Sequence, residues 1–237
     1  MRFYFDTNAT SPLAGIVTEA LAKGDFIFAN PSSLHQEGKR ARKLINEVRG
    51  YLYQLFSLNP KEFDLVFHSG STEGLSSLIL GFALSDSANK VWIAQTDHSC
   101  VYSLKDSSLL KNEQVHLFAV DHGGQFNRKA LRENLSKVTP GESLLHYTAV
   151  NSETGVVWDL PAAVRLKKDT GVSVVVDAAQ WIGKVPDWKK LDPHLDAYVF
   201  SGHKIGALPG VGFSFIKKFF SYLPLFQCGG QQEGLRG

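Results

Sequence analysis

Residues 171–180 have the sequence GVSVVVDAAQ, in which a run of β-branched residues ends at an acid. Positions 172–176 are apolar except for Ser173, so a strand formed by them would bury side chains on both of its faces. Such strands lie inside parallel sheets that helices cover on both sides. We therefore predict a central parallel strand that ends just before Asp177.

Helix-like and strand-like segments alternate on both sides of this strand. Apolar residues at helical spacing predict helices over residues 35–56, 75–84 and 160–168, the last of them ended by Gly171. Short apolar runs predict further strands at residues 63–67, 91–94, 115–119, 144–150, 197–200 and 212–216. This alternation predicts an α/β fold in which a mostly parallel sheet is sandwiched by helices.

The composition of the chain excludes several classes of protein. Its 237 residues correspond to between one and two domains of ~150 residues. Hydrophobic residues make up 43% and charged residues 20%, which is a globular balance and not that of a disordered chain. The net charge is only +2, and no apolar run approaches the ~18 residues of a membrane span. We therefore expect neither a nucleic-acid partner nor a membrane partner.

Cysteine usage and the first residues predict a reducing compartment. The two cysteines, Cys100 and Cys228, cannot form a disulfide framework or a four-thiolate zinc site. The start of the chain has one basic residue and an acid at Asp6, which is not the pattern of a secretory signal. We expect a cytoplasmic protein without a bound metal.

Polar and reactive residues follow five of the predicted strands. In an open parallel sheet, ligands bind at the carboxyl ends of the strands, so these residues predict a binding site. They are residues 70–72, 97–98, 151–153, 177–180 and 201–204.

The first of these groups, Gly70, Ser71 and Thr72, precedes the buried helix expected at residues 75–84. Free amides in the first turn and the helix dipole favour an anion there, and the two hydroxyls add donors. An ordinary N-cap without a ligand is the alternative.

Asp177 follows the strand that is expected to be most deeply buried. A carboxylate in that position is costly unless it has a partner, and a cationic ring nitrogen would be a suitable one. A cap or a loop hydrogen bond is the alternative interpretation.

His98, His203 and Lys204 also lie at strand ends. Each imidazole could stack on a flat ligand or hold a phosphate, or it could be a structural residue. A lysine in a crevice loses solvation, and its amine is then more readily neutral and nucleophilic than that of a surface lysine. The cofactor pyridoxal 5′-phosphate (PLP) requires these groups together: a loop that binds its phosphate, an acid for its ring nitrogen, an aromatic side chain that stacks on its ring, and an amine.

A series of short motifs extends this pattern over the whole chain. The lysine lies in residues 195–204, LDAYVFSGHK, which are followed by PGVG at residues 209–212. The other motifs are residues 6–12, 30–35 with Gly38, Ala41 and Arg42, 69–73, 97–98, 151–155, 177–180 and 229–236. In these motifs and their order, the chain resembles the class V aminotransferase family, and most closely its cysteine desulfurase branch.

The resemblance implies the large domain of a fold type I PLP-dependent transferase, with PLP as the cofactor. Lys204 would hold PLP covalently, and Asp177 would pair with the pyridine nitrogen. His98 would stack on the ring and move protons, and Gln180 would hydrogen-bond the phenolic oxygen. The residues at the phosphate would be Ser71, Thr72, Ser201 and His203. Ser152 stands where the branch has an asparagine that contacts the cofactor.

The resemblance also implies a division of the chain. Residues 1–15 would be an N-terminal segment that contributes to the active site or the small domain, and residues 16–237 would be the PLP-binding large domain. The family's C-terminal third would follow Gly237, with the small domain, an arginine for the substrate carboxylate and a sulfur-accepting cysteine. Neither Cys100 nor Cys228 aligns with that cysteine, and a fragment and a naturally short protein both remain open.

The expected function is that of a PLP-dependent cysteine desulfurase-like enzyme. In the complete family, L-cysteine is converted to alanine and its sulfur is transferred, which serves sulfur metabolism and iron–sulfur cluster assembly. The expected partners are a small amino-acid substrate such as cysteine, a second copy in a homodimer and a sulfur-acceptor protein. Two alternatives stay open: another class V enzyme, such as a selenocysteine lyase or an aminotransferase, and a non-catalytic PLP-binding scaffold.

Overall fold

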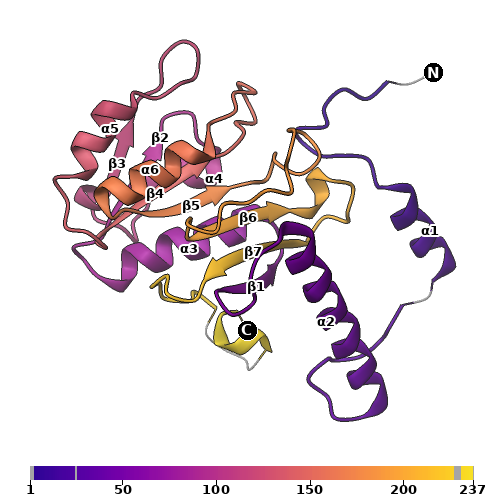
Figure 1. Cartoon of the computed structure of the whole chain (residues 1–237). Coiled ribbons are helices and arrows are strands. Elements are labelled where there is room, and N and C mark those ends of the chain that lie inside the picture. Colours follow the sequence, from indigo (N-terminus) through magenta and orange to yellow (C-terminus); the bar gives the residue numbers. More distant parts are fainter. Residues whose placement is uncertain (1–2, 25, 227–230, 237) are drawn as a thin grey trace.

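A seven-stranded mixed sheet forms the centre of the molecule (Figure 1). The computed structural model describes residues 3–24, 26–226 and 231–236. The strands lie in the order β1-β7-β6-β5-β4-β2-β3. Their bounds are β1 Phe63–His68, β2 Lys90–Ala94, β3 Val115–Phe118, β4 Ser143–Thr148, β5 Ser173–Asp177, β6 Ala197–Ser201 and β7 Gly212–Lys217.

Strand β5 lies in the middle of the sheet and is parallel to both of its neighbours, β4 and β6. The pairs β2–β3 and β2–β4 are parallel as well, and only the pairs that β7 forms with β1 and β6 are antiparallel. The predicted central strand and the mostly parallel sheet are therefore confirmed. Register places Asp177 beside Thr148 of β4 and Val199 of β6.

Alternating side chains of the strands enter two apolar cores, one on each face of the sheet. Val174 and Val176 of β5 belong to the core that α2, α5 and α6 cover, whereas Val175 belongs to the core that α3 and α4 cover. The helices span α1 Gly15–Lys23, α2 Gln36–Phe56, α3 Ser71–Ser85, α4 Ser99–Tyr102, α5 Arg128–Leu135 and α6 Leu160–Thr170. The sandwich of helices predicted from the alternation of elements is confirmed.

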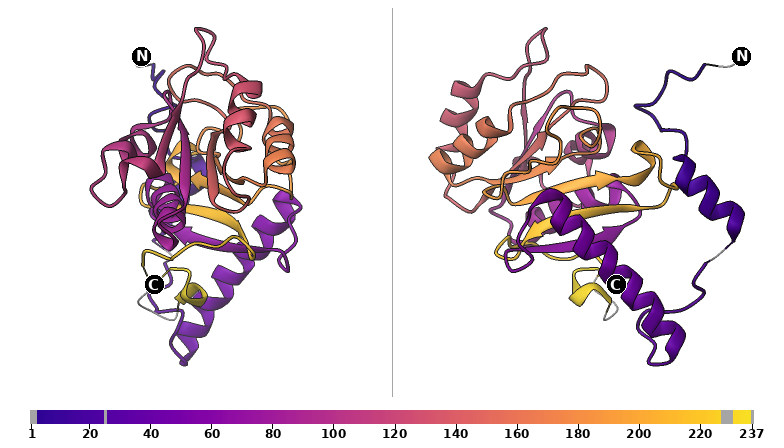
Figure 2. Two further views of the ribbon diagram at one scale, coloured as in Figure 1. Left: turned by 90° about the vertical axis from the view of Figure 1, so that its left-hand side faces the viewer. Right: turned by 45° about the vertical axis from the view of Figure 1, so that its right-hand side comes forward.

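The predicted elements differ from the observed ones mainly at their ends. Helix α3 begins at Ser71, one turn before the apolar run, so Ser71 and Thr72 belong to the helix itself. Helices α1, α4 and α5 were not predicted, since none of them has a long apolar face. Helix α1 buries none of its residues, and it stands away from the sheet together with the N-terminal end of α2 (Figure 2).

The phenylalanines near the C-terminus divide into a buried and an exposed set. Phe213 and Phe215 lie in β7 and are buried, as is Phe220, while Phe219 and Phe226 are exposed. The motif glycines Gly229 and Gly230, together with Cys228, lie outside the described residues. Within the described ranges, no helix has the length and apolarity needed to cross a bilayer.

Candidate functional site

A cavity of about 220 Å³ opens at the carboxyl ends of the parallel strands, where the polar residues were predicted to meet. Its lining is Ser71, Thr72, His98, Cys100, Thr148, Val150, Asn151, Ser152, Asp177, Ala179, Gln180, His203 and Lys204. Eight of the nine candidate residues are in this lining. The ninth, Ser201, is buried at the end of β6.

The N-terminus of α3 forms one part of the cavity. Ser71 and Thr72 present hydroxyls there, and the first-turn amides of this 15-residue helix carry the positive end of its dipole. Among the described residues, the buried Ser201 hydroxyl has no hydrogen-bond partner, and a Cβ placed on Gly70 would lie 3.8 Å from it. Because an orphaned buried hydroxyl is costly, this group of donors fits a phosphate or another anion.

Asp177 lies at another part of the cavity, at the end of β5. One of its carboxylate oxygens accepts a hydrogen bond from the Ala179 amide at 2.9 Å, and within the described residues it has no ion-pair partner. Burial raises the pKa of Asp177, and the neighbouring His146 and the Ala179 amide only partly oppose this. The side chain is therefore suited to a cationic partner that the protein itself does not supply.

A buried network of Asp97, His146 and Thr148 lies beside Asp177, and the sequence analysis identified only Asp97 of these three. The Asp97 carboxylate lies 2.8 Å from Nδ1 of His146 and accepts hydrogen bonds from Thr148 Oγ1 at 2.6 Å and the Ala94 amide at 2.7 Å. Burial opposes a charged imidazole, but Asp97 and, more weakly, Asp177 raise the pKa of His146 above its ordinary value. The signal that could have revealed it is a histidine inside a strand that is otherwise apolar.

Lys204 follows β6 in a short 3-10 turn, Gly202–Lys204. Its ammonium donates to the carbonyl oxygens of Asn8 at 2.6 Å and Ala9 at 2.8 Å. Burial lowers the pKa of this amine, while Asp177, Asp6 and Glu153 act in the opposite direction. The half-buried amine is thus easier to deprotonate than a surface lysine.

The N-terminal segment crosses this part of the cavity. The Ser11 amide donates to the His203 carbonyl at 2.9 Å, and the Ser11 hydroxyl donates to the Lys204 carbonyl at 2.8 Å. Thr10 Oγ1 lies 3.2 Å from Nδ1 of His203. The first residues of the chain therefore help to shape the site.

Gln180 is oriented by a second lysine that the sequence analysis did not single out. Lys184 donates to Oε1 of Gln180, and it also donates to Oδ1 of Asn8 at 3.1 Å. The Gln180 amide nitrogen donates to the Asn8 carbonyl at 2.8 Å. With its oxygen held by Lys184, Gln180 is a hydrogen-bond donor toward the segment over Lys204.

The remaining lining residues have structural contacts as well as access to the cavity. His98 is exposed and caps α4, because its Nδ1 accepts from the Cys100 amide at 3.2 Å. Ser152 lines the cavity, while the neighbouring Asn151 is buried and donates to the Thr96 carbonyl at 2.7 Å. Burial raises the pKa of Cys100 to about 11, so this thiol stays protonated near neutral pH.

The chain is similar to known proteins over almost all of its length. The model of the family Aminotransferase class-V matches residues 3–234. Cysteine desulfurase 2 of Trichormus variabilis is 30% identical over 235 residues, which are 98% of this chain and 58% of that protein. The chain therefore spans little more than half of the length of this curated relative.

Two solved structures share the fold. The NifS-like protein of Rickettsia africae has a TM-score of 0.86 at 25% identity, and the match covers all of this chain and 64% of the other. The structure described as SspA in complex with cysteine has a TM-score of 0.85 at 26% identity, covering all of this chain and 68% of the other.

Proposed function

Since the chain belongs to the aminotransferase class-V family, whose enzymes depend on PLP, we propose that it binds PLP in the cavity and acts on L-cysteine. The observation that carries the proposal is the lining of one cavity by the Lys204 amine, the buried Asp177 carboxylate and the N-terminus of α3. An amine, an acid and an anion cradle are the three groups that this cofactor needs from a protein.

The phosphate fits the cradle at the N-terminus of α3. Ser71 and Thr72 would donate to it together with the first-turn amides, and His203 would add a donor from the neighbouring turn. The unpartnered Ser201 hydroxyl beside Gly70 supports this assignment, because a phosphate oxygen would give it the acceptor that it lacks.

The ring fits the rest of the cavity. Asp177 would hold the positive charge of the pyridine nitrogen, and Gln180 would donate to the phenolic oxygen from the amide that Lys184 orients. His98 would stack on the ring, and Ser152 would take the place of the longer asparagine of the branch. The His146 imidazole, which is hydrogen-bonded to Asp97, would favour the ionised form of Asp177.

Lys204 is the group placed to carry protons. When bound, PLP withdraws electrons from the substrate's α carbon and so makes its proton removable. The amine of Lys204 would first attach the cofactor and, once free, would accept that proton; its lowered pKa favours the neutral form that this role requires. His98, exposed at the same cavity, would exchange a proton with the substrate thiol.

L-cysteine is the proposed substrate because the relative named above is a cysteine desulfurase and a structural neighbour was solved with cysteine. In such a reaction a thiol attacks the substrate sulfur, the carbon–sulfur bond breaks, and the carbon skeleton leaves as alanine after it gains a proton. Cys100, the cysteine that lines the cavity, is held as a thiol by its raised pKa, so we propose that a thiol other than Cys100 takes the sulfur, for example that of an acceptor protein.

We also propose a homodimer in a reducing compartment such as the cytoplasm, with iron–sulfur assembly as one use of the sulfur. Exposed apolar side chains of the N-terminal region, among them Phe26, Phe28 and Leu34, support an interface. Residues 1–15 would serve as an active-site segment, which their contacts to Lys204 support. Sedimentation velocity of the wild type and of Phe28→Asp would test the dimer: a monomeric wild type would contradict it.

The reaction is tested by incubating the PLP-loaded protein with L-cysteine and an excess of a dithiol, and by measuring alanine and sulfide. We expect equal amounts of both from the wild type and neither from Lys204→Ala. Bound cofactor without alanine would contradict the desulfurase reaction and would leave a PLP-binding protein of another function.

A further inference from the structure

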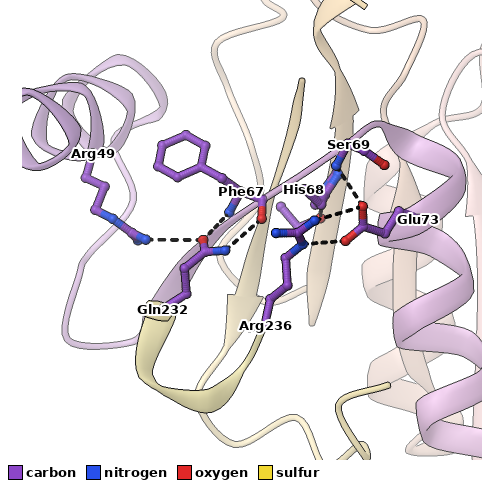
Figure 3. Close-up of polar contacts among 8 residues, drawn as sticks. Arg49, Phe67, His68, Ser69, Glu73, Gln232 and Arg236 are labelled. Atoms are coloured by element: carbon purple, nitrogen blue, oxygen red, sulfur yellow. Dashed lines mark hydrogen bonds and ion pairs between the residues drawn. The ribbon is translucent and has the colours of Figure 1, made fainter. Parts of the chain in front are cut away.

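Residues 231–236 return to the edge of the sheet and pack against β1 and α3 (Figure 3). The Gln232 side chain acts there as a short substitute for a neighbouring strand. Its amide oxygen accepts from the Phe67 amide at 2.6 Å, and its amide nitrogen donates to the Phe67 carbonyl at 2.9 Å. Arg49 of α2 also donates to the same oxygen, at 3.3 Å.

Four residues further along, Arg236 forms an ion pair with Glu73 in the first turn of α3 (Figure 3). The guanidinium contacts both carboxylate oxygens, at 2.5 Å and 3.4 Å. The second oxygen also accepts from the Ser69 amide at 2.8 Å. Together with Gln232 at Phe67, these bonds hold residues 67–70, which are the end of β1 and the turn into α3 and are called the loop 67–70 below, at Phe67 and at Ser69.

The position of Glu73 makes this ion pair relevant to the cavity. Glu73 shares the first turn of α3 with Ser71 and Thr72, so its charge lies within one helical turn of the donors proposed for the phosphate, and its side chain faces Arg236 outside the lining of the cavity. Burial alone would raise its pKa, but hydrogen bonds from Arg236 and Ser69 lower the pKa to about 2, and the side chain is ionised. An unpaired carboxylate in this turn would repel a phosphate dianion.

We propose that Arg236 is a positioning residue for cofactor binding, which neutralises Glu73 and holds the loop 67–70 so that the α3 N-terminus can accept the phosphate. This inference rests on the proposed PLP site. Because the contact at Phe67 is made by Gln232, the segment keeps an anchor of its own when Arg236 is replaced.

The test compares the affinities for PLP and for pyridoxal, which has the same ring and aldehyde but no phosphate. We expect Arg236→Met to weaken PLP binding about 5- to 10-fold, the range of a charge at a helix end, and to leave pyridoxal binding unchanged. The double variant Arg236→Met/Glu73→Gln removes the uncompensated charge and is expected to regain most of the affinity. Arg40→Met, which breaks an exposed ion pair with Glu37 on α2, is the matched control.

The outcomes distinguish a failure of the role proposed for Arg236 from a failure of the proposed PLP site. Equal losses for PLP and pyridoxal in Arg236→Met, or no recovery in the double variant, would show a purely structural role and overturn the inference. Unchanged PLP affinity would overturn it as well. A wild type that binds neither compound would overturn the proposed PLP site and the inference with it.

Discussion

Asp177 shows how a single residue can favour function at the expense of stability. It is 7% exposed, it accepts a hydrogen bond from the Ala179 amide, and the charges of His146 and His98 only partly offset its burial. Its raised pKa means that the folded protein resists ionising it, so the carboxylate destabilises the fold at neutral pH. A cationic ligand at this position would relieve that cost.

Replacing this acid should therefore have opposite effects on stability and on binding. We expect Asp177→Asn to raise the free energy of unfolding of the cofactor-free protein by roughly 1–3 kcal/mol, because a neutral amide is cheaper to bury. The same change should weaken PLP binding about tenfold or more, since a charge-assisted hydrogen bond is lost. Urea unfolding and a PLP titration measure the two quantities.

The exposed Asp106, which pairs with Lys105 on the surface, offers a matched control. Asp106→Asn should leave both quantities nearly unchanged. If Asp177→Asn destabilised the cofactor-free protein, Asp177 would stabilise the fold itself, and its proposed role as the partner of a cationic ligand would be contradicted.

His68, at the end of β1, makes the stability depend on pH. Its Nε2 lies 2.7 Å from Ser214 Oγ, and burial outweighs the attraction of Glu73 and lowers the pKa from 6.5 to about 4. The unfolded chain then binds the proton more tightly than the folded one. The contribution of His68 to the free energy of unfolding therefore increases as the pH rises from about 4 to 6.5 and is constant above that range.

We predict that this dependence contributes up to about 3 kcal/mol between the two ends of the range. His68→Gln should flatten the plot of unfolding free energy against pH, and His122→Gln, which changes an exposed histidine, should not. A slope that is equally steep in His68→Gln and in the wild type would contradict the assignment.

At the scale of the elements, two glycines in helices have opposite surroundings: Gly81 is closely packed, and Gly50 faces open space. A Cβ on Gly81 of α3 would clash with the Leu223 carbonyl, whereas a Cβ on Gly50 of α2 would meet nothing within 4 Å. We expect Gly81→Ala to cost about 1–3 kcal/mol through overpacking. Gly50→Ala should instead stabilise the fold by about 0.5–1 kcal/mol, because alanine favours the helix.

Thermal and urea unfolding of the two variants would measure these opposite effects. A neutral Gly81→Ala variant would mean that residues 222–223 do not pack on α3 as described. A destabilised Gly50→Ala variant would mean that this face of α2 is covered in solution.

The elements that the sequence predicts are those whose apolar pattern is strong. Val172 to Val176 is apolar on both faces, and the run of α3 is apolar almost throughout, so a central strand and a buried helix could be identified. Helix α5 has eight residues and buries only Leu131 and Leu135, and α1 buries nothing, so neither has an apolar face long enough to be recognised. The start of α3 at Ser71 was not predicted, because Ser71 and Thr72 are polar and do not belong to the apolar run.

At the scale of the whole molecule, the site residues that could be predicted are those that the strand order alone brings together. Parallel strands bring Asp177, Gln180 and Lys204 to one edge, and the cavity contains all three. The resemblance led us to expect the N-terminal segment near the site, but two specific contacts between distant parts of the chain were not predicted: the Asn8 carbonyl on Lys204, and Arg236 on Glu73. Such contacts have no local pattern, because the partners lie far apart in sequence.

The central claim is that this chain holds PLP through Lys204, and borohydride reduction followed by peptide mapping tests it most directly. Reduction of the PLP-treated protein should fix one cofactor mass on the peptide that contains Lys204. Lys184, the second lysine at Gln180, provides an internal comparison and should remain unmodified. Modification of Lys184 or of scattered surface lysines, or no modification at all, would contradict the claim.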